Sequence, residues 1–173
     1  MAGQPVHPTH VPVVVRLLHP DAELPRYSTE GDAGADLTSV AEVTLAPGER
    51  ALVPTGVSLA LPPGTVGLVH PRSGLAARHG VTVLNGPGTV DSGYRGEVLV
   101  NLVNLDPEEH FTVRVGDRIA QLVVQEYLHA DFSVADSLPE SARGDTGHGS
   151  TGGFATAAPT PPSTTTDPRT AAP

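Results

Sequence analysis

The chain has 173 residues, a formal net charge of −9, no cysteine and no lysine. This length suggests one domain that buries about two thirds of its unfolded surface. The lack of cysteine excludes disulfides and thiolate metal sites, and the acidic balance disfavours non-specific nucleic-acid binding. No apolar run is long enough for a transmembrane helix and no signal segment is recognisable, so we predict a cytoplasmic protein without nucleic-acid or membrane partners.

The N-terminal part of the chain predicts two strands. The apolar run 13–18 lies between Pro12 and Pro20, which suits a first strand. Residues 24–34 are polar and turn-like, and the stretch Ala-Gly-Ala-Asp-Leu at 33–37 then begins a second, short strand. Asp36 stands beside an apolar residue in that strand and therefore needs a partner.

Beyond residue 43, β-rich runs alternate with turn signals at 46–49, 61–64, 85–86, 106–107 and 116–117. This spacing is typical of a sandwich or barrel, so we predict an all-β fold. The one convincing helix is short, at 73–79, with Ser73 as N-cap and Gly80 after its end. Arg72 and Ser73 at its start suit an anion, although a capped helix with a surface arginine is the commoner explanation for such a pattern.

The stretch 85–97, Asn-Gly-Pro-Gly-Thr-Val-Asp-Ser-Gly-Tyr-Arg-Gly-Glu, is predicted to be an active-site hairpin loop. Aliphatic and β-branched residues at 81–84 and 98–103 predict a strand on each side of this Gly/Pro loop. Asp91 could take a proton from water, and Tyr94 offers a flat face for packing against a ring. The alternative is a β-turn in which Asp91 caps backbone amides.

The C-terminal third contains two further motifs. Residues 116–124 form a turn and a strand in which Gln121 is the one polar side chain of an apolar run, and it could also simply face outward. The glycine-rich segment 143–152 has P-loop spacing but lacks the lysine and the strand–helix context, so we reject a P-loop. It could be an anion-binding arm or a linker into the Ala/Thr/Pro tail, which we predict to be disordered. No histidine cluster indicates zinc.

Five stretches in order, 33–37, 71–74, 85–97, 116–122 and 143–152, resemble the trimeric dUTP diphosphatase (dUTPase) family. The likeness runs from the first strand to Phe154, and His148 together with the arginine-only basic residues is most similar to actinobacterial members. The resemblance implies a jelly-roll-like β-barrel with one short helix, assembled as a homotrimer with three sites between subunits. We expect a barrel domain at 1–142, an arm at 143–154 that closes a site, and a tail at 155–173.

The resemblance also implies hydrolysis of dUTP to dUMP and pyrophosphate, which lowers dUTP and supplies dUMP for thymidylate synthesis. Water would attack the α-phosphorus with Mg²⁺ bound to the triphosphate, and Asp91 would orient and deprotonate that water. Tyr94 would lie under the deoxyribose and leave no room for a 2′-hydroxyl. The uracil edge would be read by the Asn85 side chain and by backbone around Thr89, Val90 and Leu99.

The remaining implied roles concern the phosphates and the metal. Asp36 would act on Mg²⁺ through a coordinated water. The phosphates would be held by Arg72, Ser73, Gly74 and Gln121. The arm of another subunit would bring Arg143 to the γ-phosphate, enclose the phosphates with Gly149, Ser150 and Thr151, and stack His148 on uracil, where most members carry Phe.

Two alternatives remain. A dCTP deaminase of the same fold needs a glutamate after the hairpin, but the aligned position is Asn101, which cannot act as a general base. A catalytically silent nucleotide-binding trimer would need neither the Asp91 carboxylate nor a closing arm. We therefore favour the hydrolase.

Overall fold

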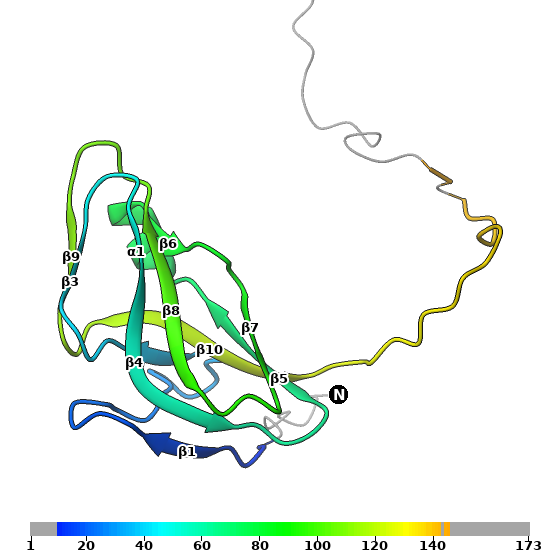
Figure 1. Cartoon of the computed structure of the whole chain (residues 1–173), viewed down its shortest axis with the longest axis horizontal. Coiled ribbons are helices and arrows are strands. Elements are labelled where there is room, and N and C mark those ends of the chain that lie inside the picture. The colour runs from blue at the N-terminus through cyan, green and yellow to red at the C-terminus, as the bar shows by residue number, and fades with distance from the viewer. Residues whose placement is uncertain (1–9, 143, 146–173) are drawn as a thin grey trace, which may run out of the picture. The chain divides into compact units, whose positions relative to one another are not determined.

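A computed structural model describes residues 10–142 and 144–145 of the chain (Figure 1). The chain divides into two units, 1–130 and 131–173. Within the described residues, every strand and helix belongs to the first unit. No helix among the described residues is long and apolar enough to cross a membrane.

Two four-stranded sheets form the first unit. The strand order in one sheet is β1-β4-β8-β6, and in the other it is β2-β10-β5-β7. Every neighbouring pair is antiparallel. The first sheet contains β1 (Val14–Leu17), β4 (Arg50–Ala60), β8 (Glu97–Asn104) and β6 (Val81–Val83), and the second contains β2 (Ala35–Thr38), β10 (Arg118–Glu126), β5 (Thr65–His70) and β7 (Gly88–Asp91).

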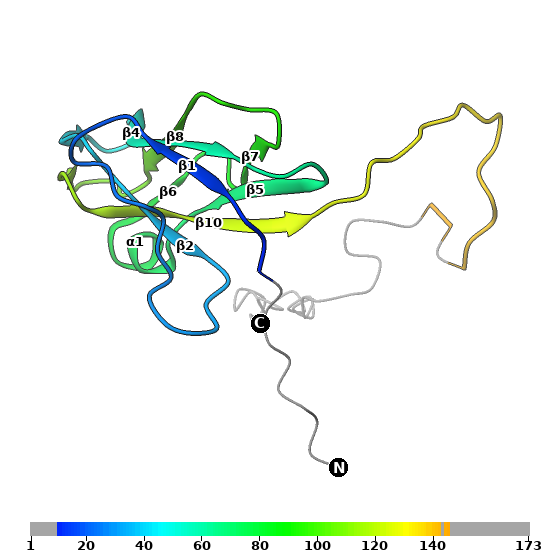
Figure 2. The same cartoon turned by 90° about the horizontal axis from the view of Figure 1, so that it is seen from below.

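The core lies between these sheets, because buried side chains of both belong to one hydrophobic cluster. Figure 2 shows β4 and β8 on one side of the unit and β2 and β10 on the other. Alternation explains which residues turn inward: along β8, Val98, Val100 and Leu102 are buried, whereas Leu99 between them is exposed. The predicted all-β, jelly-roll-like class is confirmed.

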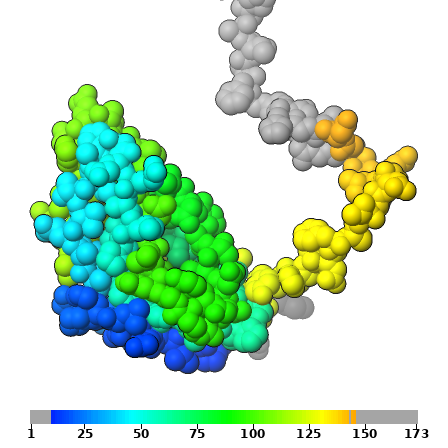
Figure 3. Space-filling model, in the orientation of Figure 1, coloured from blue at the N-terminus to red at the C-terminus, as the bar shows by residue number. Residues whose placement is uncertain are grey.

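A two-stranded ribbon and a short helix complete the unit. The ribbon pairs β3 (Val43–Leu45) with β9 (Phe111–Val113), and the two segments lie side by side at the surface in Figure 3. Leu45 and Val113 enter the core. The helix α1 (Ser73–His79) ends at Gly80, whose left-handed φ of 63° confirms the predicted C-terminal glycine. The prediction for Ser73 was wrong, because Arg72 occupies the N-cap position and makes no side-chain capping bond.

The predicted hairpin loop differs most from expectation. It contains a strand of its own, β7, and β7 pairs with β5 in the opposite sheet. The flanking strands β6 and β8 pair with each other directly, with Val81 opposite Asn104. The chain therefore leaves the first sheet after β6, adds one strand to the edge of the second sheet, and returns as β8.

Candidate active site

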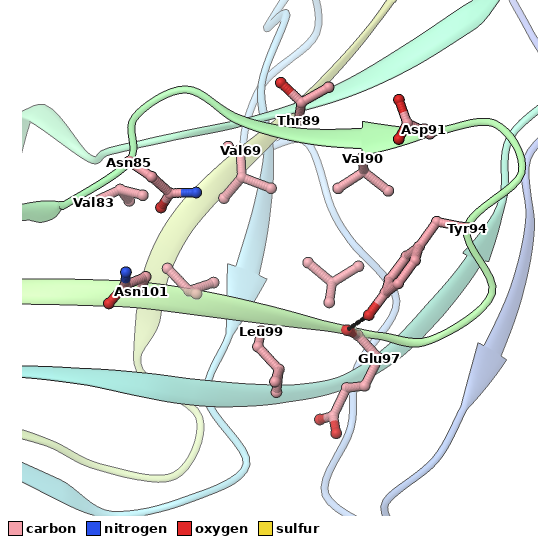
Figure 4. Close-up of a pocket in the computed structure, with 13 residues that line it drawn as sticks. Val69, Val83, Asn85, Thr89, Val90, Asp91, Tyr94, Glu97, Leu99 and Asn101 are labelled. Atoms are coloured by element: carbon pink, nitrogen blue, oxygen red, sulfur yellow. Dashed lines mark hydrogen bonds between the residues drawn. The ribbon is translucent and has the colours of Figure 1, made fainter.

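A cavity of about 190 Å³ opens between β7 and β8. Figure 4 shows the side chains of Thr89 and Asp91 on one face of β7 and that of Val90 on the other, in the gap toward β8. The burial of β7 alternates in the same way, with Asp91 exposed and Val90 buried. Six predicted site residues line this cavity: Asn85, Thr89, Val90, Asp91, Tyr94 and Leu99.

Tyr94 is fixed on one side of this cavity. Its hydroxyl donates a hydrogen bond of 3.0 Å to the carbonyl oxygen of Glu97, so the ring spans the turn between β7 and β8 (Figure 4). The guanidinium of Arg95 donates to the carbonyl oxygens of Ser92 and Tyr94, each at 2.7 Å, and this closes the turn from outside. The turn thus carries Asp91 and Tyr94 on a frame held by its own hydrogen bonds.

The base of the turn is attached to a bulge in β4. The register between β4 and β8 shifts between Pro54 and Ser58, and Gly56 in this bulge has a φ of 67°. Three hydrogen bonds of 2.7 Å join the bulge to the start of β8: Thr55 Oγ1 donates to Val98 O, Gly56 N donates to Glu97 Oε1, and Ser58 Oγ donates to Arg95 O. Sequence reasoning missed these anchors, which lie about 40 residues before the turn.

A second cluster surrounds Asp36 on β2. The Asp36 side chain is 6% exposed and accepts four hydrogen bonds from four residues. Oδ1 accepts from Arg72 Nε at 3.1 Å and from Gln121 Nε2 at 3.4 Å. Oδ2 accepts from Arg118 Nη1 at 2.9 Å and from Ser28 Oγ at 3.0 Å.

This cluster gathers three predicted phosphate and metal residues: Asp36, Arg72 and Gln121. Gln121 pairs with Asp36 across the β2–β10 register, and its side-chain amide donates to Asp36 Oδ1. Its contact with phosphate stays a prediction. Ser73 and Gly74 follow Arg72 in the first turn of α1. Sequence reasoning missed Arg118, although it lies within the stretch 116–122, and it missed Ser28, for which no pattern gave a signal.

The hydrogen bonds of Asp36 limit how its carboxylate could bind a Mg²⁺-coordinated water. A carboxylate offers about four acceptor positions, and the four donors around Asp36 use them. A water bound to Mg²⁺ would have to displace one of these donors, so the Asp36–Mg²⁺ contact stays a prediction. Within the described residues no three His, Asp, Glu or Cys side chains are grouped to bind a metal ion.

The two clusters lie at opposite edges of the second sheet. Asp36 on β2 faces Gln121 on β10, whereas Asp91 on β7 faces Val66 on β5, which faces Gln125 on β10. Strands lie about 4.8 Å apart and rise about 3.4 Å per residue, so three strand steps and four residues separate Asp36 from Asp91 by roughly 20 Å. The Asp91 carboxylate accepts no hydrogen bond from any other residue that the structure describes.

Five predicted arm residues, Arg143, His148, Gly149, Ser150 and Thr151, lie outside the described residues, as does the tail. Their roles stay predictions.

Comparison with known proteins identifies the family. The dUTPase family profile matches residues 20–152. The chain belongs to the dUTPase family. Two deoxyuridine 5′-triphosphate nucleotidohydrolases are close relatives. That of Bifidobacterium longum subsp. infantis is 60% identical over 84% of this chain and 92% of its own length, and that of Thermobifida fusca is 58% identical over 86% and 83%. The predicted enzyme class, with actinobacterial relatives, is confirmed, and the deaminase alternative is not favoured.

Solved structures agree with the family assignment. The dUTPase of Staphylococcus bacteriophage 80alpha, determined with dUpNHpp, has a TM-score of 0.76 and 28% identity over 82% of this chain and 98% of its own. A mutant dUTPase from phage phi11 of S. aureus, described as revealing the coordination of a structural Mg(II) ion, has a TM-score of 0.68 and 26% identity over 75% of this chain and 99% of its own.

Proposed function

We propose that the chain hydrolyses dUTP to dUMP and pyrophosphate by attack of water on the α-phosphorus, at sites shared between subunits of a homotrimer. The observation that carries this proposal is the cavity between β7 and β8, which Asn85, Asp91 and Tyr94 line together. It combines an amide, an exposed carboxylate and an aromatic ring in the stretch between β6 and β8. These are the groups that base recognition, water activation and sugar packing each require.

The narrow gap between β7 and β8 suits a pyrimidine. β7 is an edge strand of its sheet, so half of its backbone groups have no partner strand and are available to a base. Asn85 can both donate and accept hydrogen bonds, as the uracil edge demands. Backbone near Thr89, Val90 and Leu99 would complete the recognition. Selectivity against dTTP would come from a hairpin too tight for the 5-methyl group.

The separation of the two clusters supports a shared site. Asp91 must act at the α-phosphorus, next to phosphates held by Arg72 and Gln121, yet these residues lie roughly 20 Å apart in one chain by strand spacing. A second subunit that brings its Asp36 cluster to the first subunit's hairpin would remove this gap. Leu52 on β4 and Leu99 on β8, 61% and 45% exposed, lie diagonally on one face of the strand pair and offer apolar surface for such a contact.

In the reaction, Asp91 orients the attacking water and accepts its proton as the bond to the α-phosphorus forms. The β- and γ-phosphates leave together as pyrophosphate. Arg72, Ser73, Gly74 and Gln121 bind the phosphates, and Asp36 holds the Arg72 guanidinium in place for them. When bound, Mg²⁺ neutralises phosphate charge and assists the leaving group. The arm 143–154 closes over the phosphates from another subunit, with Arg143 on the γ-phosphate and His148 on the base.

The test is release of pyrophosphate from dUTP, dTTP, dCTP and UTP by the purified full chain, with and without Mg²⁺. We expect dUTP to be hydrolysed selectively and Mg²⁺ to stimulate the rate. Asp91→Asn should lower kcat by at least about 100-fold, the lower range for general-base catalysis, with nearly unchanged dUTP affinity. Asp21→Asn, another exposed carboxylate, is the control. A uracil product from dCTP would instead support the deaminase, and near-normal turnover by Asp91→Asn would exclude its role as base.

The homotrimer has its own test. Light scattering should give three times the mass of the chain, and mixing Asp91→Asn with Arg72→Gln subunits should restore part of the activity that each variant has lost. Such complementation requires that one site take Asp91 and Arg72 from different chains. A mixture no more active than its components would contradict the shared site.

A further inference from the structure

We propose that Gly96 is a specificity-determining position: its missing side chain allows the Tyr94 ring to lie where it excludes a ribose 2′-hydroxyl. The inference rests on the proposed function, because that function assigns the sugar contact to Tyr94. It goes further in naming the residue that sets where the ring lies.

The Tyr94 ring lies directly against the backbone of Gly96. A Cβ atom at Gly96 would be 2.6 Å from Tyr94 Cζ and 3.0 Å from Cε2, and it would also overlap the hydroxyl. Real Cβ contacts are essentially never that short. The φ angle of Gly96 lies outside the left-handed region, unlike that of Gly56. Gly96 is therefore required for the space it leaves to the ring, and alanine could adopt its backbone conformation.

An added methyl group at position 96 would move the ring and leave the backbone in place. The ring would shift before the backbone does, since Tyr94 is 46% exposed and its hydroxyl is held by one hydrogen bond, to Glu97 O. Both neighbours of Gly96 are bonded to the β4 bulge, Arg95 through its backbone carbonyl oxygen and Glu97 through its side-chain carboxylate. The folded barrel would therefore persist with a displaced Tyr94.

Ring displacement has a specific chemical consequence. A site that rejects a substrate only because the substrate has one extra hydroxyl group discriminates weakly, by about 100-fold, unless the excluding group is rigid. In this chain two features give the ring that rigidity: close contact with Gly96 and the hydrogen bond to Glu97 O. Loss of either should admit UTP while dUTP hydrolysis continues, because the extra space does not affect a sugar without the hydroxyl.

The experiment compares kcat/KM for dUTP and UTP in the full chain. For Gly96→Ala we expect the dUTP/UTP ratio to fall by about 10–100-fold, mainly through faster use of UTP. Gly93→Ala is the matched control, because it lies in the same turn and a Cβ there would meet no atom within 4 Å. Its ratio should match that of the unaltered chain. In a Tyr94→Ala background, Gly96→Ala should not lower the dUTP/UTP ratio of kcat/KM further, since the ring through which Gly96 acts is absent.

Each alternative result would overturn the inference. An unchanged ratio in folded Gly96→Ala would show that the ring position does not depend on this residue. An equal fall in the Tyr94→Ala background would show that Gly96 acts by another route. If Gly96→Ala does not fold, Tyr94→Phe decides: it frees the ring from Glu97 O without adding an atom, and an unchanged ratio there overturns the inference. Failure of the proposed function is distinct, because the unaltered chain would then not hydrolyse dUTP at all.

Discussion

Replacing Asp36 with asparagine should weaken both the fold and the binding of phosphates. The substitution preserves size but removes the charge shared by Arg72 and Arg118, whose side chains are 24% and 51% exposed. A hydrogen bond to a charged group at the partly buried Arg72 contributes about 1.5–3 kcal/mol, and the more exposed Arg118 pair about 0.2–1 kcal/mol. The free energy of unfolding should therefore fall by about 2–4 kcal/mol.

The assay has two parts. Thermal melts at matched protein concentration should show Tm lowered by roughly 10 °C for Asp36→Asn, with Asp21→Asn as control. Calorimetric titration with pyrophosphate, without any divalent cation, should show weaker binding because the Arg72 guanidinium is no longer held in place. A variant with unaltered Tm and pyrophosphate affinity, but a raised Mg²⁺ requirement, would refute this reasoning and restore Asp36 as a metal contact.

Two further predictions concern acid stability and the arm. Backbone N–H groups of Glu109 and then Glu108 donate to Asp106 and hold its pKa below the usual value. This stabilisation is complete above the ordinary aspartate pKa of about 3.9 and is lost as pH falls through the lowered pKa of the folded state. Asp106→Asn should thus lower the free energy of unfolding at pH 6 and make its decrease at acidic pH less steep. Chemical denaturation at several pH values measures this, and an unchanged pH dependence below pH 4 would contradict the prediction. Truncation before Arg143 should cut kcat severely with an unchanged Tm, whereas removal of 155–173 alone should alter neither; full activity without the arm would disprove its role.

The shape of the Asn85–Glu97 stretch illustrates what local sequence cannot show. Its glycines and its one proline predicted a loop between two strands, and both flanking strands are present as β6 and β8. The strand β7 within it was not predicted, because four residues beginning with Gly88 have little strand signal of their own. β7 exists because it pairs with Val66–Val69 of β5, about 20 residues earlier in the chain.

The fold class and the family follow from the amino-acid sequence alone, which also predicts the candidate site residues. These inferences are possible because alternation, turn residues and short motifs involve residues that are close together in the sequence. Which of these residues come into contact, in contrast, depends on the tertiary structure. Asp36 meets Arg118, 82 residues away, and the bulge at Gly56 holds Glu97, 41 residues away. Such contacts depend on strand register and on the space between side chains, as at Gly96 and Tyr94, and these are set when the two sheets close over their common core.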